Sequence, residues 1–151
     1  MSDPSPIVLL SGTELERANV IYDELAFARS REGADRTFGL EASGRLVALG
    51  RIQDQQGALE LGGFWVAETA RGRGLARRMV DHVLAQLAPG ELAWCIPFEH
   101  LISFYEGFGM LPARPEDAPP GIQAKLGFCR ERHARGDYVS GTGLLRYSRP
   151  G

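Results

Sequence analysis

The sequence has few of the features that mark secreted, membrane-spanning or nucleic-acid-binding proteins. Its 151 residues include only two cysteines, Cys95 and Cys129, which are too few for a disulfide framework and lack the spacing of metal ligands. The N-terminal MSDPSPIVLL has no basic start, and no apolar run approaches the roughly 20 residues of a membrane-spanning helix. A net charge of -2 gives no general attraction for nucleic acid. We therefore expect a reduced, cytoplasmic protein with no metal, membrane or nucleic-acid partner.

The composition that is present fits a single domain over residues 1–151. A hydrophobic content of 44% is enough to build a core, and 24% charged residues is ordinary for a globular protein. Cys95 lies in the apolar run LAWCI and is expected in that core. For Cys129 two interpretations stay open, a surface thiol or a packed helix residue.

Hydrophobic periodicity and turn residues predict an α+β fold. Ser11 and Glu14 form a capping-box pattern at the start of the first helix. Three strands in a row indicate an antiparallel meander, and a helix between two later strands indicates one parallel crossover. The predicted strands are 6–10 (buried), 37–41, 45–53, 58–67, 91–97 and 137–148, and the predicted helices are 12–29, 74–87, 99–106 and 122–133.

The stretch VAETARGRGLARRMV joins a predicted strand to a predicted helix. The first N–H groups of a helix lack partners and attract anions, and glycines let a phosphate approach the backbone. Arginines can add charge-assisted hydrogen bonds. The segment therefore fits a cradle for a diphosphate, formed by Arg71, Gly72, Arg73, Gly74, Leu75 and Ala76. The alternative is a turn with a solvated arginine surface; neither the Walker A pattern nor the dinucleotide-binding pattern is present.

The spacing Arg71-x-x-Gly74-x-Ala76 resembles the acyl-CoA motif Q/R-x-x-G-x-G/A of the GNAT superfamily of N-acetyltransferases. A second segment, LISFYEGFGM at 101–110, resembles the FYEKLGF-type segment of the same superfamily. The resemblance covers residues 45–110 well and weakens afterwards. It implies the GNAT fold, a mixed and mostly antiparallel central sheet flanked by helices, in which acetyl-CoA enters a cleft between two splayed strands.

The resemblance also implies roles for individual residues. Trp65 and Val66 would end the strand that pairs with the pantetheine arm, and a backbone N–H near Val66 would polarise the thioester carbonyl. Tyr105 matches the tyrosine that protonates the leaving thiolate, with a core aromatic as its alternative. Phe98 stands where many members have an asparagine, which suggests a more apolar pocket.

Attack by an amine requires a base, because an alkyl amine is almost entirely protonated, as the ammonium ion, at neutral pH. Glu60 lies six residues before Val66, an offset that carries the base in some histone-acetylating members of the superfamily. The two side chains share a face only if no bulge intervenes, and Glu60 is otherwise expected at a solvated strand edge. Glu99 and His100 are rival candidates.

The segment 112–136 is longer than a hairpin needs and contains several basic residues. Three interpretations of this segment stay open: a solvated helix that covers the sheet edge, the contact of a homodimer, or a wall over the acceptor site that favours an acidic substrate. The expected function is transfer of an acetyl group from acetyl-CoA to a primary amine of a small molecule or peptide. A GNAT-like acyl-CoA-binding sensor without turnover is the alternative.

Overall fold

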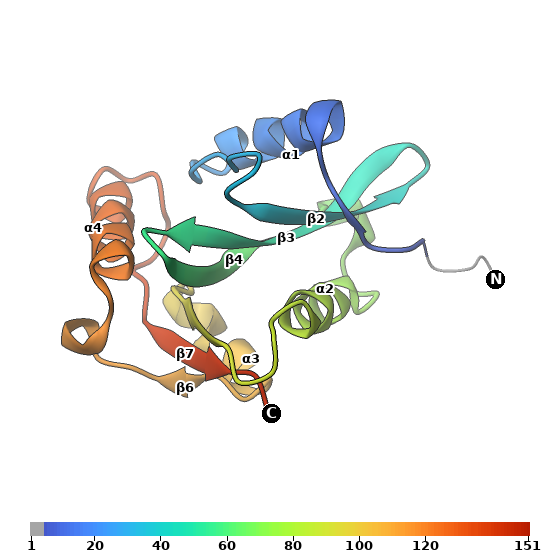
Figure 1. Cartoon of the computed structure of the whole chain (residues 1–151). Coiled ribbons are helices and arrows are strands. Elements are labelled where there is room, and N and C mark those ends of the chain that lie inside the picture. Colours follow the sequence, from blue (N-terminus) through green and yellow to red (C-terminus); the bar gives the residue numbers. More distant parts are fainter. Residues whose placement is uncertain (1–4) are drawn as a thin grey trace. The chain divides into compact units, whose positions relative to one another are not determined.

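The computed structural model describes residues 5–151, in which three consecutive strands, β2 to β4, lie between the first two α-helices (Figure 1). Every helix and strand that the sequence predicts is present, with shifted bounds, and one further short strand, β6, is added. The strands are β1 Val8–Leu9, β2 Arg36–Ala42, β3 Arg45–Gln55, β4 Ala58–Val66, β5 Leu92–Cys95, β6 Leu111–Pro112 and β7 Leu145–Ser148. The α-helices are α1 Gly12–Glu24, α2 Leu75–Ala85, α3 Ile102–Glu106 and α4 Pro120–Ala134.

The strands follow one another in the hydrogen-bonded order β1-β2-β3-β4-β5-β7-β6. The pairs β1–β2, β2–β3, β5–β7 and β6–β7 are antiparallel. Strands β4 and β5 are parallel, with Glu60 opposite Trp94 and Leu61 opposite Cys95. Because α2 lies between β4 and β5 in the chain, the predicted parallel crossover is confirmed. The predicted α+β class with a mixed, mostly antiparallel sheet is confirmed as well.

The chain divides into two compact units, and the division passes through β3 and β4. The first unit holds the chain up to Ile52 together with Gly63–Gln86. The second holds Gln53–Gly62 and Leu87–Gly151. Each unit has its own hydrophobic cluster and is described by itself below.

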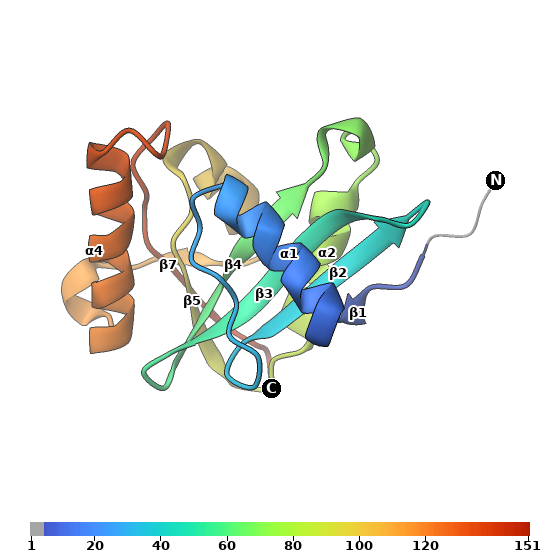
Figure 2. The same cartoon turned by 90° about the horizontal axis from the view of Figure 1, so that it is seen from above.

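In the first unit, α1 and α2 cover opposite faces of the strands (Figure 1). Helix α1 lies across β2 and β3 (Figure 2). Leu15, Ala18 and Tyr22 repeat at helical spacing and are buried against Leu46 and Leu49 of β3. The apolar side of α1 predicted from the sequence is therefore the side that packs.

Two features of the first unit differ from the prediction. Val8 and Leu9 of β1, a two-residue strand that is first in the strand order and pairs with β2, are exposed rather than buried. Helix α1 ends at Glu24 rather than at residue 29, since Ala26 adopts a φ of 60°, outside the helical region. The N-cap Ser11 makes no side-chain capping bond, so the capping-box pattern marks the helix start without forming its hydrogen bonds.

In the second unit, α4 packs on the strands through an apolar cluster that includes Ile122, Leu126, Trp94 and Leu144. Gly121, in the first turn of α4, lies so close to β3 that an added Cβ would be 1.9 Å from the carbonyl oxygen of Gln55. The two cysteines are both buried in this unit, so Cys95 is a core residue as predicted and Cys129 is a packed helix residue.

The last predicted strand is much shorter than expected. Residues 137–148 were predicted as one strand, but only Leu145–Ser148 forms β7. An added Cβ at Gly141 would lie 2.5 Å from Oε1 of Glu99, and one at Gly143 would lie 2.8 Å from Cδ1 of Ile102. The segment before β7 is therefore shaped by close packing against the chain before and within α3 rather than by a regular ladder.

Candidate active site

The predicted cradle lies in the first unit, where β4 leads into α2. The strand ends at Val66, a 3-10 turn follows at Glu68–Ala70, and α2 begins at Leu75. Gly72 and Gly74 have φ angles of +80° and +75°, a left-handed conformation that glycine adopts readily. Apart from the residues adjacent to each glycine, no atom of the described residues lies within 4 Å of a Cβ added at either one. The backbone of this loop is therefore open to a ligand.

The chemistry of this loop fits an anion. Gly74 is the N-cap of α2 and has no side chain to cap it, so the first amides of the helix keep their capacity to donate. Arg71 and Arg73 are exposed on the same loop, and Leu75 and Ala76 form the first turn of the helix. Guanidinium groups beside uncapped helix amides suit a diphosphate. The predicted cradle residues are thus brought together, and their role in binding coenzyme A stays a prediction.

A cavity of about 420 Å³ lies beside the cradle, also within the first unit. Its lining includes Arg45 of β3, Arg73 of the loop and Arg78 of α2. The Arg78 guanidinium also donates a hydrogen bond to the backbone oxygen of Ser5. Three arginines around one cavity add positive potential next to the cradle.

Trp65 and Val66 are half-buried at the end of β4. Trp65 packs against the hydrophobic cluster of α1. Between Glu60 and Val66 the strand passes through Gly63, whose φ of +61° interrupts the regular pleat. The side chains of Glu60 and Val66 were expected on one face of β4 only if the strand alternates without interruption. Because Gly63 interrupts it, alternation does not assign the two residues to one face.

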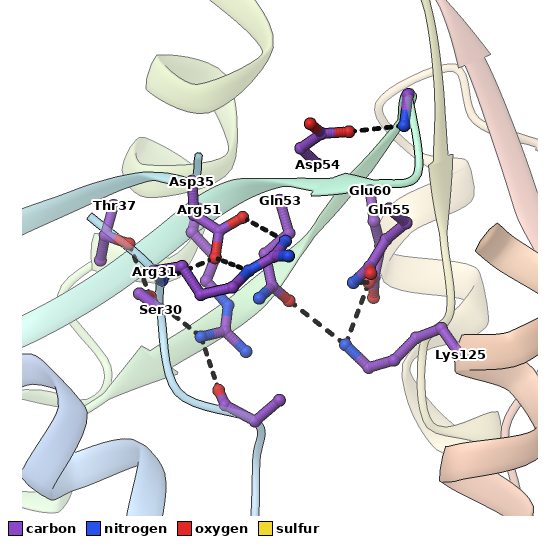
Figure 3. Close-up of polar contacts among 12 residues, drawn as sticks. Ser30, Arg31, Asp35, Thr37, Arg51, Gln53, Asp54, Gln55, Glu60 and Lys125 are labelled. Atoms are coloured by element: carbon purple, nitrogen blue, oxygen red, sulfur yellow. Dashed lines mark hydrogen bonds and ion pairs between the residues drawn. The ribbon is translucent and has the colours of Figure 1, made fainter. Parts of the chain in front are cut away.

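A buried cation that the sequence analysis missed lies beside Gly63 in the first unit. Arg51 on β3 is 2% exposed, and its Nη1 donates to the Ala28 carbonyl at 2.8 Å and to Ser30 Oγ at 3.0 Å (Figure 3). Its guanidinium lies 4.0 Å from the centre of the Tyr22 ring, a stabilising cation–π contact. Its Nε has no hydrogen-bond partner among the described residues. The signal in the sequence was an arginine within the apolar run LVALGRI.

Tyr105, the predicted acid, lies on α3 in the second unit and is buried. Its ring meets Phe104 edge to face at a centroid distance of 5.2 Å. Burial, and to a lesser extent the nearby Cys95, raises the pKa of the Tyr105 phenol well above its ordinary value. The hydroxyl is therefore protonated throughout the physiological pH range.

Glu60, the predicted base, is buried in the second unit rather than placed at a solvated edge. Its Oε1 accepts hydrogen bonds from Lys125 Nζ at 3.0 Å and from Gln55 Nε2 at 2.9 Å (Figure 3). Lys125 also donates to Gln53 Oε1 at 3.2 Å. The side chains of Lys125 and Glu60 are only 12% and 7% exposed. The base that the sequence predicts thus lies in a buried ion pair with the only lysine of the chain.

The rival bases lie together at the start of the 3-10 turn before α3. Glu99 is exposed, and its amide donates to the Gly141 carbonyl at 3.0 Å. The His100 ring stacks on Phe98 at 6.0 Å, and Phe98 meets Tyr138 edge to face at 5.1 Å. Phe98 is therefore part of an aromatic cluster.

Glu99 also lines a cavity of about 480 Å³ in the second unit, which the sequence analysis did not identify. The cavity brings Glu99 together with Cys129, Arg130 and His133 of α4. These residues come from distant parts of the chain. The only sign of them in the sequence was the basic segment 112–136, for which a wall over the acceptor site was one interpretation. Over residues 5–151 no group of three or more His, Cys, Asp or Glu side chains is arranged to hold a metal ion. In the same part of the chain, no helix is long and apolar enough to cross a membrane.

Comparison with known proteins agrees with this geometry. The model of the acetyltransferase (GNAT) family matches residues 9–110, which is more than half of the chain. A search of curated proteins finds no match. Among solved structures, the ribosomal-protein-S18-alanine N-acetyltransferase of Escherichia coli aligns with a TM-score of 0.66 and 18% identity, over 97% of this chain and 95% of that one.

Two further solved structures are similar in fold. Rv2747 from Mycobacterium tuberculosis, in complex with CoA and NLQ, gives a TM-score of 0.66 at 12% identity, over 95% of this chain and 98% of that one. N-acetylglutamate synthase from Neisseria gonorrhoeae, in complex with coenzyme A and L-arginine, gives 0.64 at 14% identity, over 98% of this chain but 34% of that one. At these identities the likeness concerns the fold, whereas the family match concerns the sequence. The chain belongs to the GNAT family of acetyltransferases.

Proposed function

We propose that this protein transfers an acetyl group from acetyl-CoA to the primary amine of a small molecule or peptide. The observation that carries the proposal is the open cradle at the N-terminus of α2, where Gly72 and Gly74 expose the backbone beside Arg71 and Arg73. Two similar structures, Rv2747 and the Neisseria synthase, are complexes with coenzyme A, which supports the same ligand here. Acetyl-CoA supplies an activated acyl group when it is bound.

In this proposal the first unit binds the co-substrate. The amides of Leu75 and Ala76 and the two arginines hold the diphosphate, and the backbone near Trp65 and Val66 pairs with the pantetheine arm. A backbone N–H near Val66 donates to the thioester oxygen, on which negative charge develops during attack. We assign the acid to Tyr105, whose protonated hydroxyl donates to the leaving sulfur.

We assign the role of base to Glu60, acting through a water molecule. Glu60 is already bonded to Lys125 and Gln55, so it receives the amine proton through a bridging water rather than by direct contact. Because the Glu60 carboxylate already accepts hydrogen bonds from Lys125 and Gln55, a second candidate function is also favoured, an acyl-CoA-binding sensor without turnover. Coenzyme A binding with no acetyl transfer across an amine library would select the sensor.

The cradle is tested by two substitutions of Gly74 that differ in one negative charge. Aspartate and asparagine have the same size, tolerate a left-handed backbone and act as N-caps, so both variants are expected to fold. Both variants place a capping side chain over the first amides of α2 and should weaken acetyl-CoA binding, and Gly74→Asp, which also adds a negative charge at the diphosphate site, should weaken it by about a further tenfold relative to Gly74→Asn. Isothermal titration calorimetry gives both dissociation constants. Equal affinities in the two variants would remove the cradle from the proposal.

A further inference from the structure

The cavity of about 480 Å³ in the second unit has the size and composition of a small-molecule site. The C-terminal half of α4 and the segment that leads into β7 both line it. Its interior is apolar, formed in part by the buried side chains of Leu126, Cys129 and Leu144. An apolar interior of this kind suits an aliphatic group.

Charged groups of opposite sign stand on the same cavity. Glu99 lines it from the turn before α3, and Arg130 and His133 line it from α4, where a spacing of three residues puts them on one side of the helix. Glu99 is set against Gly141, whose backbone oxygen accepts its amide hydrogen bond at 3.0 Å. The cavity thus has one carboxylate and two basic side chains.

These charges are not used within the described part of the protein. The neighbouring Arg132 and Arg135 pair with Asp137 at 3.3 and 3.4 Å. Over residues 5–151, no ion pair involves Glu99, Arg130 or His133. The charges of this cavity are therefore available to a ligand that carries both an ammonium and a carboxylate.

We propose that this cavity binds an apolar α-amino acid, with its ammonium at Glu99, its carboxylate at Arg130 and His133, and its side chain over Leu126 and Leu144. This assignment rests on the proposed function, because it names the acceptor of the acetyl group. In the reaction the amine nitrogen forms a bond to the acyl carbon and the carbon–sulfur bond breaks. The ammonium loses two protons; the thiolate receives one through Tyr105, and Glu60 receives the other through the bridging water and releases it to solvent.

The test uses the full chain and L-leucine as the ligand, first without coenzyme A. Isothermal titration calorimetry should detect leucine binding, and Glu99→Gln and Arg130→Gln should each weaken it by about tenfold, because each variant removes one charge-assisted contact. The matched control is Arg132→Gln on the same helix, which should leave leucine affinity unchanged. Unchanged affinity in both cavity variants would overturn the assignment.

Two analogues of leucine separate the two ends of the cavity. 3-Methylbutylamine lacks the carboxylate, so its binding should fall in Glu99→Gln and not in Arg130→Gln. 4-Methylpentanoate lacks the amine and should show the reverse. If both analogues lose affinity equally in both variants, the polar ends have been assigned wrongly.

The same ligands distinguish this inference from the proposed function. Binding of leucine without acetylation in the presence of acetyl-CoA would keep the site but overturn its role as acceptor site and the proposed activity. Acetyl transfer to 3-methylbutylamine as efficient as to leucine, with no leucine binding, would keep the activity and overturn the cavity assignment. Acetyl-leucine formed by the wild type, and reduced through KM in Arg130→Gln, is the expected result.

Discussion

At the scale of single residues, the first prediction concerns Tyr105. Tyr105→Phe removes the proton donor but keeps the buried ring and its contact with Phe104, so coenzyme A affinity should stay within about twofold while kcat falls by roughly 100-fold or more. Burial raises the pKa of Tyr105, so its hydroxyl stays protonated and kcat should show no loss between pH 8 and 10 from its titration. A variant that loses coenzyme A binding as well would show that Tyr105 is structural.

Lys125 makes the second prediction at this scale. Lys125→Met leaves the Glu60 carboxylate buried without its cation, and removing one partner of a buried pair typically destabilises a protein by about 3–5 kcal/mol. The control is the double variant Lys125→Met with Glu60→Gln, which removes both charges and should recover most of that loss. Urea denaturation gives the free energies of unfolding. Equal stability of the wild type and the single variant would mean that the pair is effectively solvated.

The residues that the sequence predicted and missed differ in one physical respect. The cradle is a local motif, so spacing alone places Arg71 and Gly74 on one loop. The partner of Glu60 lies 65 positions away in Lys125, and no local pattern encodes such a contact. Glu60 is buried because α4 brings Lys125 onto it, and since local sequence does not show this packing, a solvated strand edge stood as the alternative to its role as base.

At the scale of elements, two glycines of α4 make opposite predictions. A Cβ at Gly121 would lie 1.9 Å from the Gln55 carbonyl oxygen, so Gly121→Ala forces the helix away from β3 and should destabilise the protein by about 1–3 kcal/mol. Apart from its chain neighbours and the backbone of its own helix, no atom of the described residues lies within 4 Å of a Cβ added at Gly127, so Gly127→Ala should stabilise the helix by about 0.5–1 kcal/mol. Thermal and urea unfolding of the pair checks both signs. Two changes of the same sign would contradict the packing of α4.

Element types were predictable, whereas element ends depended on packing. The periodicity of α1 identified its buried side correctly, but Ala26 leaves the helical conformation, a backbone change that no pattern of apolar residues announces. The last strand was predicted too long because Gly141 and Gly143 read as weak strand positions. Their real function is to let the chain lie against Glu99 and Ile102, and this needs the tertiary structure.

At the scale of the whole molecule, buried thiols and phenols predict loss of stability at alkaline pH. Burial raises the pKa of Cys129 to about 11 and that of Tyr22 to about 12, and it raises the pKa values of Cys95 and Tyr105 further. In the unfolded chain the thiols ionise near pH 9 and the phenols near pH 10. Above those values the unfolded state holds fewer protons than the folded state, so the free energy of unfolding falls as pH rises.

The size and the onset of this fall can both be measured. Each group that ionises only in the unfolded state lowers the free energy of unfolding by about 1.4 kcal/mol per pH unit, so the four together give roughly 5 kcal/mol per unit above about pH 10. Replacing both cysteines by alanine should move the onset from about pH 9 to about pH 10, because only the phenols of Tyr22 and Tyr105 then remain. Urea denaturation under reducing conditions from pH 7 to pH 10.5 follows the onset. If the free energy of unfolding begins to fall at the same pH with and without the cysteines, the thiols titrate alike in the folded and unfolded states. That result would contradict their burial in the second unit.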